Sequence, residues 1–223
     1  MIITVVLIFS AVFAYLLGSV NGAIIASRYV FRRDVREMGS GNAGLTNFYR
    51  NFGTRGMALV VGIDVVKGVL SALLGGWLLG LTAGDYAGAL DFVAIGRLFG
   101  TFCCVLGLCL PVFHGFRGGK GILCGAAAAF VVDWRAGLIC LVVFGIAFGL
   151  TRYVSLGSVL GSVSFPITIA VLGYGSLAFT LASFSVALIL VGHRSNIVRL
   201  ISRSESKFEF KKNVTRKLDQ DEF

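Results

Sequence analysis

Long apolar runs separated by short polar breaks dominate this chain of 223 residues. A helix needs roughly 20 apolar residues to cross a hydrocarbon core of about 30 Å. The pattern therefore predicts an all-α, polytopic integral membrane protein with about seven transmembrane helices. The runs lie at about 2–27, 56–80, 93–113, 121–132, 136–151, 156–174 and 177–192.

Composition supports a membrane protein, since 57% of the residues are hydrophobic and 14% are charged. Soluble domains have about 45–50% apolar residues and about 25% charged ones. We expect one membrane domain at 1–201, followed by a polar tail of basic and acidic residues at 202–223 that lies in the cytoplasm. The N-terminal run has no basic residue before Arg28, so we interpret it as a first span and not as a secretory signal.

The run at 121–132 is short for a span, so it is expected to tilt, to begin within the preceding loop, or to be re-entrant. Six spans is therefore the main alternative to seven. Six Lys and Arg residues lie in 28–55, two in 114–120, one at Arg152 and eight from residue 193 onward. Seven spans place all of these on one side, and basic loops favour the cytoplasm. We predict an outside N-terminus and a cytoplasmic C-terminus.

The formal net charge of +9 is spread over loops at the ends of the apolar runs. This distribution favours anionic membrane lipids as partners and not nucleic acid. The five cysteines lie in apolar runs without a CxxC pair, so we expect reduced core residues. His114 and His193 have no companion ligands at metal spacing. We predict no metal and no cofactor.

The polar segment at 36–50 reads REMGSGNAGLTNFYR and lies between two long apolar runs. Its three glycines allow close backbone approach to a ligand, and its side-chain donors suit a phosphate. A simple turn is the alternative, but connections between helices usually have about 2–8 residues. The candidate donors are Ser40, Asn42, Thr46, Asn47 and Arg50.

Two further polar segments are predicted on the same side of the membrane. Residues 111–121 read PVFHGFRGGKG, and glycines around a lysine before an apolar run are typical of a phosphate-binding turn. The spacing is not that of a Walker A loop, and a tight turn remains the alternative. Residues 193–200 read HRSNIVRL and precede Glu205. In a helix His193 and Asn196 would share one face, although a histidine here can also be a plain interfacial side chain.

Asp64 and Lys67 lie one helical turn apart inside the predicted span 56–80. Charges within a span are costly and are usually paired or functional. We favour a structural ion pair over a catalytic role.

The motifs resemble those of the bacterial acyl-phosphate:glycerol-3-phosphate acyltransferases, known as PlsY. The first is GSGNAGLTNFYR at 39–50, with Leu45 where the family more often has alanine. The second is LP at 110–111 with FRGGKG at 116–121, and the third is HRSN at 193–196 with Arg199 and Glu205. Supporting matches at 64–68 and 151–156 extend the resemblance over nearly the whole chain.

Two departures from the family pattern stand near the second motif. Leu108 occupies a position where the family usually has histidine, so a role for that histidine is not transferred. Ile122, Leu123 and Cys124 replace the small and hydroxyl residues that usually follow the GGKG turn. The second change is expected to reshape an acyl pocket.

The resemblance implies an enzyme of phospholipid biosynthesis in the bacterial cytoplasmic (inner) membrane, with its active site toward the cytoplasm. It would transfer a fatty acyl group from acyl phosphate to the sn-1 hydroxyl of glycerol 3-phosphate, giving lysophosphatidic acid and phosphate. Its partners would be these two substrates, membrane lipids and the enzyme that supplies acyl phosphate. The polar segments and apolar runs agree with this class of reaction, because two phosphate-bearing substrates require two anion sites beside an apolar region.

The resemblance also implies roles for particular residues. Glycerol 3-phosphate would be held by Ser40, Arg50, Lys120, His193 and Asn196. Further substrate-binding residues would be Gly41, Asn42, Thr46, Asn47, Gly118, Gly119, Gly121 and Glu205. In this hypothesis the backbone of 118–121 holds the acyl-phosphate head.

Direct attack is favoured over an acyl-enzyme, because neither a Ser-His-Asp set nor an HxxxxD pattern is present. The fifth residue after His114 is Gly119, and the fifth after His193 is Val198. The proton acceptor is either His193 or a substrate phosphate oxygen. Only the resemblance selects acyl phosphate over acyl-CoA or acyl carrier protein. A transporter of an organic phosphate or other anion is the alternative function, although no inverted repeat is visible.

Overall fold

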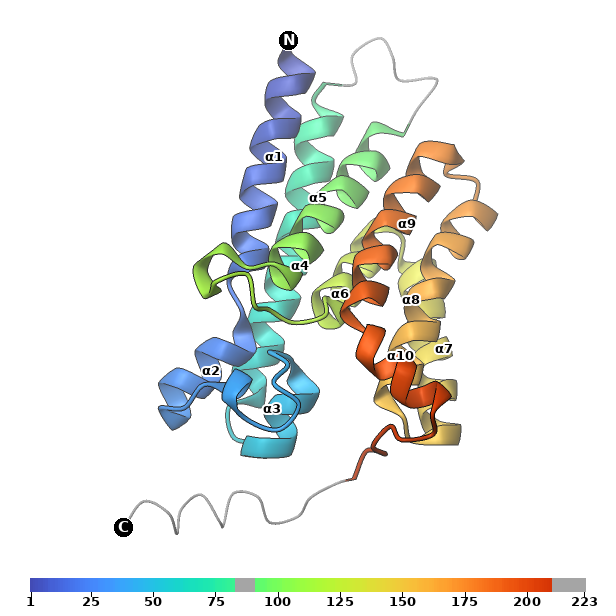
Figure 1. Ribbon diagram of the computed structural model, residues 1–223. Coiled ribbons are helices and arrows are strands. Elements are labelled where there is room, and N and C mark those ends of the chain that lie inside the picture. The colour runs from blue at the N-terminus through green and yellow to red at the C-terminus, as the bar shows by residue number, and fades with distance from the viewer. Residues whose placement is uncertain (83–90, 210–223) are drawn as a thin grey trace.

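Ten α-helices make up the regular structure of residues 1–82 and 91–209, which are the residues that the computed structural model describes (Figure 1). Two short 3₁₀ turns, η1 and η3, join them, and no strand occurs in the described part. The predicted all-α membrane fold class is confirmed. The helices are α1 Ile2–Ser19, α2 Gly22–Phe31, α3 Leu45–Phe52, α4 Met57–Gly80, α5 Phe92–Cys109, α6 Ile122–Val132, α7 Trp134–Thr151, α8 Val154–Val171, α9 Gly175–Gly192 and α10 Arg194–Ile201; η1 is Val35–Glu37 and η3 is Val112–His114.

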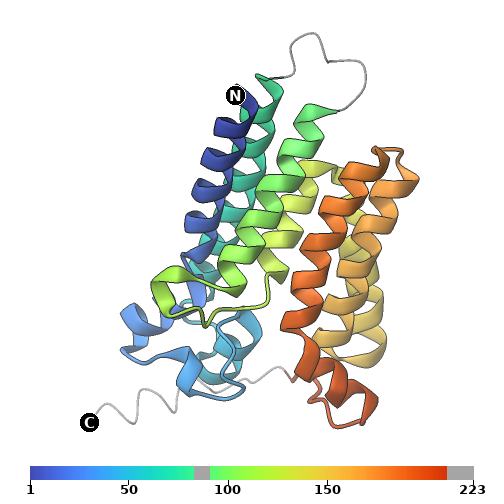
Figure 2. The same cartoon turned by 45° about the horizontal axis from the view of Figure 1, so that its top comes forward.

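The long helices form two neighbouring groups with α6 between them. Helices α1, α4 and α5 pack together, α7, α8 and α9 form the second group, and α5 also contacts α9 (Figures 1 and 2). Six membrane-spanning candidates are found among the described residues, whereas α6 has only 11 residues. At 1.5 Å per residue α6 is about 16 Å long, which is short of a bilayer core. Seven crossings therefore stay a prediction.

The polar segments nevertheless meet at one end of the helix bundle. Helices α2, α3 and α10 lie at the end opposite the N-terminus in Figure 1. Hydrogen bonds join residues 36 and 50 of the first polar segment to residues 114 and 206, which are far away in the chain. This gathering agrees with the one-sided distribution of basic residues that the sequence indicates.

The first apolar run forms two helices instead of one, because the chain breaks after α1. Asn21 caps α2, its Oδ1 accepting from the Ile24 N–H at 3.0 Å, and asparagine is among the preferred residues at this position. Lys67 Nζ donates to the carbonyl oxygens of Gly18 and Val20 at 3.4 and 2.8 Å. Lys67 and the Asn21 side chain thus pair with backbone groups that the break leaves without helical partners. Hydropathy alone does not reveal this break.

Glycines let the helices of the first group approach very closely. A Cβ atom on Gly75 of α4 would overlap the carbonyl oxygen of Gly96 on α5, and one on Gly100 would overlap that of Ser71. A Cβ on Gly107 of α5 would overlap the carbonyl of Tyr15 on α1. Small residues at such interfaces let backbones come together in a membrane, where packing replaces the hydrophobic effect.

Two charged side chains and most of the cysteine thiols are buried inside the helix bundle. The Lys67 Nζ and Asp64 Oδ1 atoms are 2.7 Å apart, with side-chain exposures of 2% and 7%. The predicted pairing of the two charges is therefore present in the structure, while its purely structural role stays a prediction. All five cysteines are free, and four of them are buried.

The outer faces of the long helices carry large apolar side chains that are exposed. Such a surface suits a lipid environment, since soluble monomers rarely expose apolar patches of this extent. Examples are Phe9, Val12, Leu73, Trp77, Leu141, Ile146 and Phe184.

Candidate active site

Asn47 organises the first polar segment from its centre. Its Nδ2 lies 3.0 Å from each of the carbonyl oxygens of Val35, Met38 and Asn42. Its Oδ1 accepts from the Ser40 N–H at 3.0 Å. Asn47 is buried, and the hydrogen bonds of its amide in this structure go to the loop itself.

Two glycines allow the loop to turn around this amide. Gly39 has φ of 57° and Gly41 has φ of 70°, a conformation that side chains other than glycine rarely adopt. A Cβ on Gly39 would also lie 2.5 Å from Asn47 Oδ1. The turn leaves Ser40 and Gly41 exposed, while Asn42 and Thr46 are half-buried.

The glycine-rich second segment packs on the end of α5 and on the first segment. The Gly119 N–H donates to the Leu108 carbonyl at 3.0 Å, and a Cβ on Gly118 would overlap that oxygen. A Cβ on Gly119 would lie 2.6 Å from the carbonyl oxygen of Ala43 in the first segment. The two predicted anion-binding loops therefore touch each other through their backbones.

Lys120 connects this second segment to the third one. Its Nζ donates to Asn196 Oδ1, and Asn196 Nδ2 donates to Glu205 Oε1 at 2.7 Å. Glu205 also accepts from Ser155 Oγ and from Arg199 Nε, both at 2.7 Å. The structure thus joins three predicted site residues, Lys120, Asn196 and Glu205, in one chain of hydrogen bonds.

The charges of this cluster shift one another's pKa values. Burial lowers the pKa of Lys120 to about 8; the charge of Glu205 opposes this, while Arg199 and Arg50 add to it. Burial alone would raise the pKa of Glu205, but hydrogen bonds from Ser155, Asn196 and Arg199 outweigh it and hold the pKa below its usual value. Cations outnumber carboxylates here, so the cluster is suited to an anion.

His193 lies where α9 ends and α10 begins, and it is 3% exposed. Its Nδ1 is 2.8 Å from the Ile189 carbonyl oxygen. A carbonyl can only accept, so Nδ1 carries the proton and Nε2 of the neutral ring has a free lone pair. Burial, followed by the charge of Lys120, lowers the pKa of His193 to about 4, although the bond to Ile189 raises it. The imidazole is therefore neutral near pH 7.

Arg50 joins the first segment to the chain beyond α10. Its Nη2 donates to the Ser206 carbonyl at 3.3 Å, and its neighbour Tyr49 stacks on Phe208 with ring centroids 5.3 Å apart. The Phe208 N–H donates to the Arg152 carbonyl at 2.8 Å. The first part of the predicted tail therefore packs on the helices, while 210–223 lie outside the described residues.

The structure joins Lys120 to Asn196 and Asn196 to Glu205 by hydrogen bonds, and it places Gly119 beside the Ala43 carbonyl. In the described part of the chain no hydrogen bond links the side chains of the first segment's Ser40, Asn42 and Thr46 to the Lys120 cluster. The described residues also hold no group of three or more His, Cys, Asp or Glu side chains arranged for a metal ion.

Sequence reasoning missed three residues that support these segments. Ser155 donates to Glu205; it lies in the supporting match at 151–156, but no role was predicted for its hydroxyl. Asn21 Nδ2 donates to the Ala43 carbonyl at 3.1 Å, and a lone amide within an apolar run was its signal. Arg36 reaches the carbonyls of His114 and Arg117, a contact no spacing rule predicts.

Comparisons with known proteins agree on one family. Residues 8–203 match the family described as glycerol-3-phosphate acyltransferase. The chain is 38% identical over 207 residues to the glycerol-3-phosphate acyltransferase of Thermoanaerobacter pseudethanolicus, covering 93% of this chain and 98% of that protein. It is 37% identical over 202 residues to that of Clostridioides difficile, covering 91% and 95%.

Two solved structures are similar in fold and sequence. The glycerol 3-phosphate form of PlsY, an integral membrane glycerol 3-phosphate acyltransferase, aligns with a TM-score of 0.79 and 34% identity, covering 91% of this chain and 96% of that one. Its lysophosphatidic acid form aligns with a TM-score of 0.77 and 32% identity, covering 92% and 96%.

Proposed function

Because the chain belongs to the glycerol-3-phosphate acyltransferase family of membrane enzymes, which gives lysophosphatidic acid, we propose that its acyl donor is an acyl phosphate. The acyl group passes to the sn-1 hydroxyl of glycerol 3-phosphate by direct attack, at the cytoplasmic face of the bacterial inner membrane. The enzyme that makes acyl phosphate is the expected supplier of this substrate.

The observation that supports two adjacent anion sites is the convergence of three basic segments, two of them glycine-rich, on Lys120 and Gly119, whereas the choice of acyl phosphate as donor rests on the family resemblance. Lys120 bonds to the third segment through Asn196, and its neighbour Gly119 contacts the first segment at Ala43. One anion could bind on either side of this lysine. A reaction between two phosphate-bearing substrates requires two such anion sites next to each other.

We assign glycerol 3-phosphate to the side lined by Arg50, Lys120, His193 and Asn196, with Ser40 closing the site from the first loop. The two cations would provide charge-assisted hydrogen bonds to its phosphate. The backbone of 118–121 would hold the acyl-phosphate head, with Gly41, Asn42 and Thr46 nearby. Asn47 and Glu205 would act through the segments that they hold in place.

The proposed chemistry is one displacement at the acyl carbon. The sn-1 oxygen forms the new ester bond, the mixed anhydride bond to phosphate breaks, and inorganic phosphate leaves with the bonding pair. The hydroxyl proton goes to a phosphate oxygen or to His193 Nε2, which has the free lone pair. Its lowered pKa of about 4 makes His193 a weak base, which favours an orienting role with phosphate as the acceptor.

An acyl phosphate is already activated, so the reaction needs little base strength. No acyl-enzyme is required, because donor and acceptor would lie side by side. The alternative of an anion transporter receives no support from the comparisons, which match acyltransferases along nearly the whole chain.

The test is phosphate release by the purified protein in detergent, supplied with palmitoyl phosphate with and without glycerol 3-phosphate. Phosphate and lysophosphatidic acid should form only with both substrates. Arg50→Ala should raise the KM for glycerol 3-phosphate by roughly 10- to 100-fold, the loss expected for hydrogen bonds from a charged donor. Arg194→Ala, which removes an exposed arginine one residue beyond His193, is the matched control.

Donor choice is tested in the same assay with palmitoyl-CoA and palmitoyl-acyl carrier protein. Turnover with either of these, and none with palmitoyl phosphate, would refute the assigned donor while leaving the family activity intact. His193→Ala separates the two proton acceptors: a loss mainly in KM supports an orienting role, and a loss confined to kcat supports a base.

A further inference from the structure

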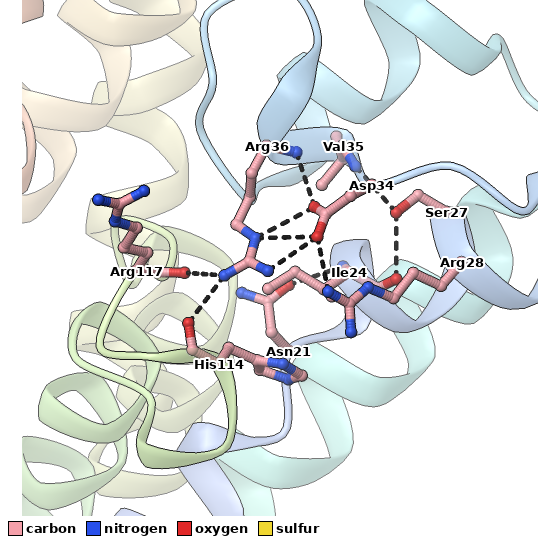
Figure 3. A network of polar contacts seen from close by, with 9 residues as sticks. All are labelled: Asn21, Ile24, Ser27, Arg28, Asp34, Val35, Arg36, His114 and Arg117. Atoms are coloured by element: carbon pink, nitrogen blue, oxygen red, sulfur yellow. Dashed lines mark hydrogen bonds and ion pairs between the residues drawn. The ribbon is translucent and has the colours of Figure 1, made fainter.

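Arg36, the first residue of the first polar segment, reaches across to the second segment, and Asp34 orients its guanidinium. Arg36 Nε and Nη2 lie 3.1 and 2.8 Å from Asp34 Oδ1 and Oδ2 (Figure 3). Its Nη1 donates to the carbonyl oxygens of His114 at 2.8 Å and Arg117 at 3.3 Å. The guanidinium therefore binds a carboxylate on one edge and two backbone carbonyls on another.

This arrangement leaves Arg36 unsuited to be a phosphate ligand itself. Three of its nitrogens are engaged with protein acceptors, and its side chain is only 20% exposed. Hydrogen bonds from Arg36 hold the pKa of Asp34 well below its usual range, so the carboxylate is charged at neutral pH. Arg28 binds the same carboxylate at 2.9 Å, but among the described residues its side chain makes no hydrogen bond to the second segment.

The turn η1, which carries Arg36, is bonded to α2 on one side and to Asn47 on the other. Val35 in this turn is fully buried, and the Val35 N–H donates to Ser27 Oγ of α2 at 3.1 Å. The Val35 carbonyl accepts from Asn47, the residue that organises the first segment. Figure 3 shows this turn placed between α2 and the second segment. The position of Arg36 is thus tied to the geometry of the first loop.

On the other side, Arg36 binds the turn at 114–117, whose own backbone bonds run from the His114 and Phe116 N–H groups to the Pro111 carbonyl at 3.1 and 3.0 Å. Gly115 and Phe116 both have positive φ, 63° and 58°, and Phe116 is exposed. A non-glycine residue is strained in this conformation. The His114 carbonyl that Arg36 binds is also the acceptor for the Arg117 N–H, at 3.4 Å. The turn leads directly into Gly118 and Gly119.

We propose that Arg36 is a positioning residue for the acyl donor, which fixes the turn at 114–117 and so sets the glycine loop against the first segment. This inference rests on the proposed function, since it takes 118–121 as the donor site. Lys120 is held independently by Asn196 and packs beside Gly192 at the end of α9. Loss of Arg36 should therefore disturb the acyl donor more than glycerol 3-phosphate.

The experiment measures kcat and both KM values for Arg36→Ala, Arg36→Lys and Arg28→Ala with palmitoyl phosphate and glycerol 3-phosphate. We expect Arg36→Ala to lower kcat/KM for palmitoyl phosphate by roughly 10- to 100-fold, as for lost hydrogen bonds from a charged donor. The KM for glycerol 3-phosphate should change less than about threefold. Arg36→Lys should restore little, because an ammonium cannot match a planar fork on both edges.

Arg28→Ala is the matched control, because it removes an arginine from the same Asp34 without touching the second segment. It should stay within about twofold of the parent enzyme, since an exposed ion pair contributes little. Thermal unfolding in detergent reports whether each variant is folded. If Arg36→Ala and Arg28→Ala have equal kinetic constants, or if the glycerol 3-phosphate KM alone rises, the positioning role is overturned.

Gly119→Ala separates this inference from the proposed function. If Gly119→Ala raises the KM for palmitoyl phosphate and Arg36→Ala does not, the donor site stands and the role of Arg36 fails. If neither variant affects the donor while both affect glycerol 3-phosphate, the assignment of the glycine loop to the donor fails, and the role of Arg36 fails with it.

Discussion

The charge on Lys120 should give the enzyme an alkaline limit that one substitution removes. Burial lowers the pKa of Lys120 to about 8, so the side chain is about 90% protonated at pH 7 and about 10% at pH 9. If only the charged form binds the phosphate of glycerol 3-phosphate, kcat/KM should fall about tenfold between these two pH values. Because kcat/KM reports the free enzyme, its alkaline limit should lie near pH 8, the pKa of Lys120.

The assay is the initial rate with palmitoyl phosphate and glycerol 3-phosphate both well below their KM values, from pH 6.5 to 9.5, corrected for spontaneous hydrolysis. Lys120→Arg keeps a positive charge over this whole range, because an arginine pKa lies above 12. Its kcat/KM should be lower because of altered geometry, but without the alkaline fall. An equal fall in the parent enzyme and in Lys120→Arg would show that another group titrates, and would refute the reasoning.

Three further substitutions test the supports of the site. Glu205→Gln removes the charge that raises the Lys120 pKa, so the alkaline limit should move to lower pH, with the glycerol 3-phosphate KM about tenfold higher; an unchanged limit would contradict this coupling. Asn47→Ala leaves several loop groups unpaired and should destabilise the protein by at least about 2 kcal/mol, seen as a lower melting temperature in detergent. Phe208→Ala loses its stacking on Tyr49, worth about 1 kcal/mol, and should speed proteolytic cleavage after residue 201; cleavage at the parent rate would argue against a packed segment.

Hydropathy located the long helices because a membrane span needs a minimum length of apolar chain. The break at Val20 and Asn21 was not predicted, because its compensation comes from Lys67, 47 residues away from Val20. The pairing of Lys67 with Asp64 could be predicted, since two charges one turn apart in a span have no cheaper solution. Local periodicity thus finds elements, while their interruptions depend on distant partners.

The sequence identified the three polar segments, but not which of their side chains would be bonded to neighbouring protein groups. Asn47 and Glu205 were both predicted as substrate ligands, and the structure shows each of them bonded to several neighbouring groups. Residue type and spacing cannot distinguish a ligand from a support, because both need polar atoms near the site. Arg36 was missed for another reason, because its contacts with the carbonyls of His114 and Arg117 depend on residues 78 and 81 positions away.

The electrostatic arrangement around Lys120 explains why so many of these residues serve as supports. A buried ammonium is costly, and here a single carboxylate, Glu205, opposes that cost through Asn196. The charges of Arg50 and Arg199 repel the ammonium and lower the Lys120 pKa further. Without substrate the site therefore has an excess of positive charge. A bound phosphate would relieve this excess and raise the Lys120 pKa again. Substrate binding and lysine protonation should therefore favour each other, and the supports are what hold the lysine in its unfavourable position beforehand.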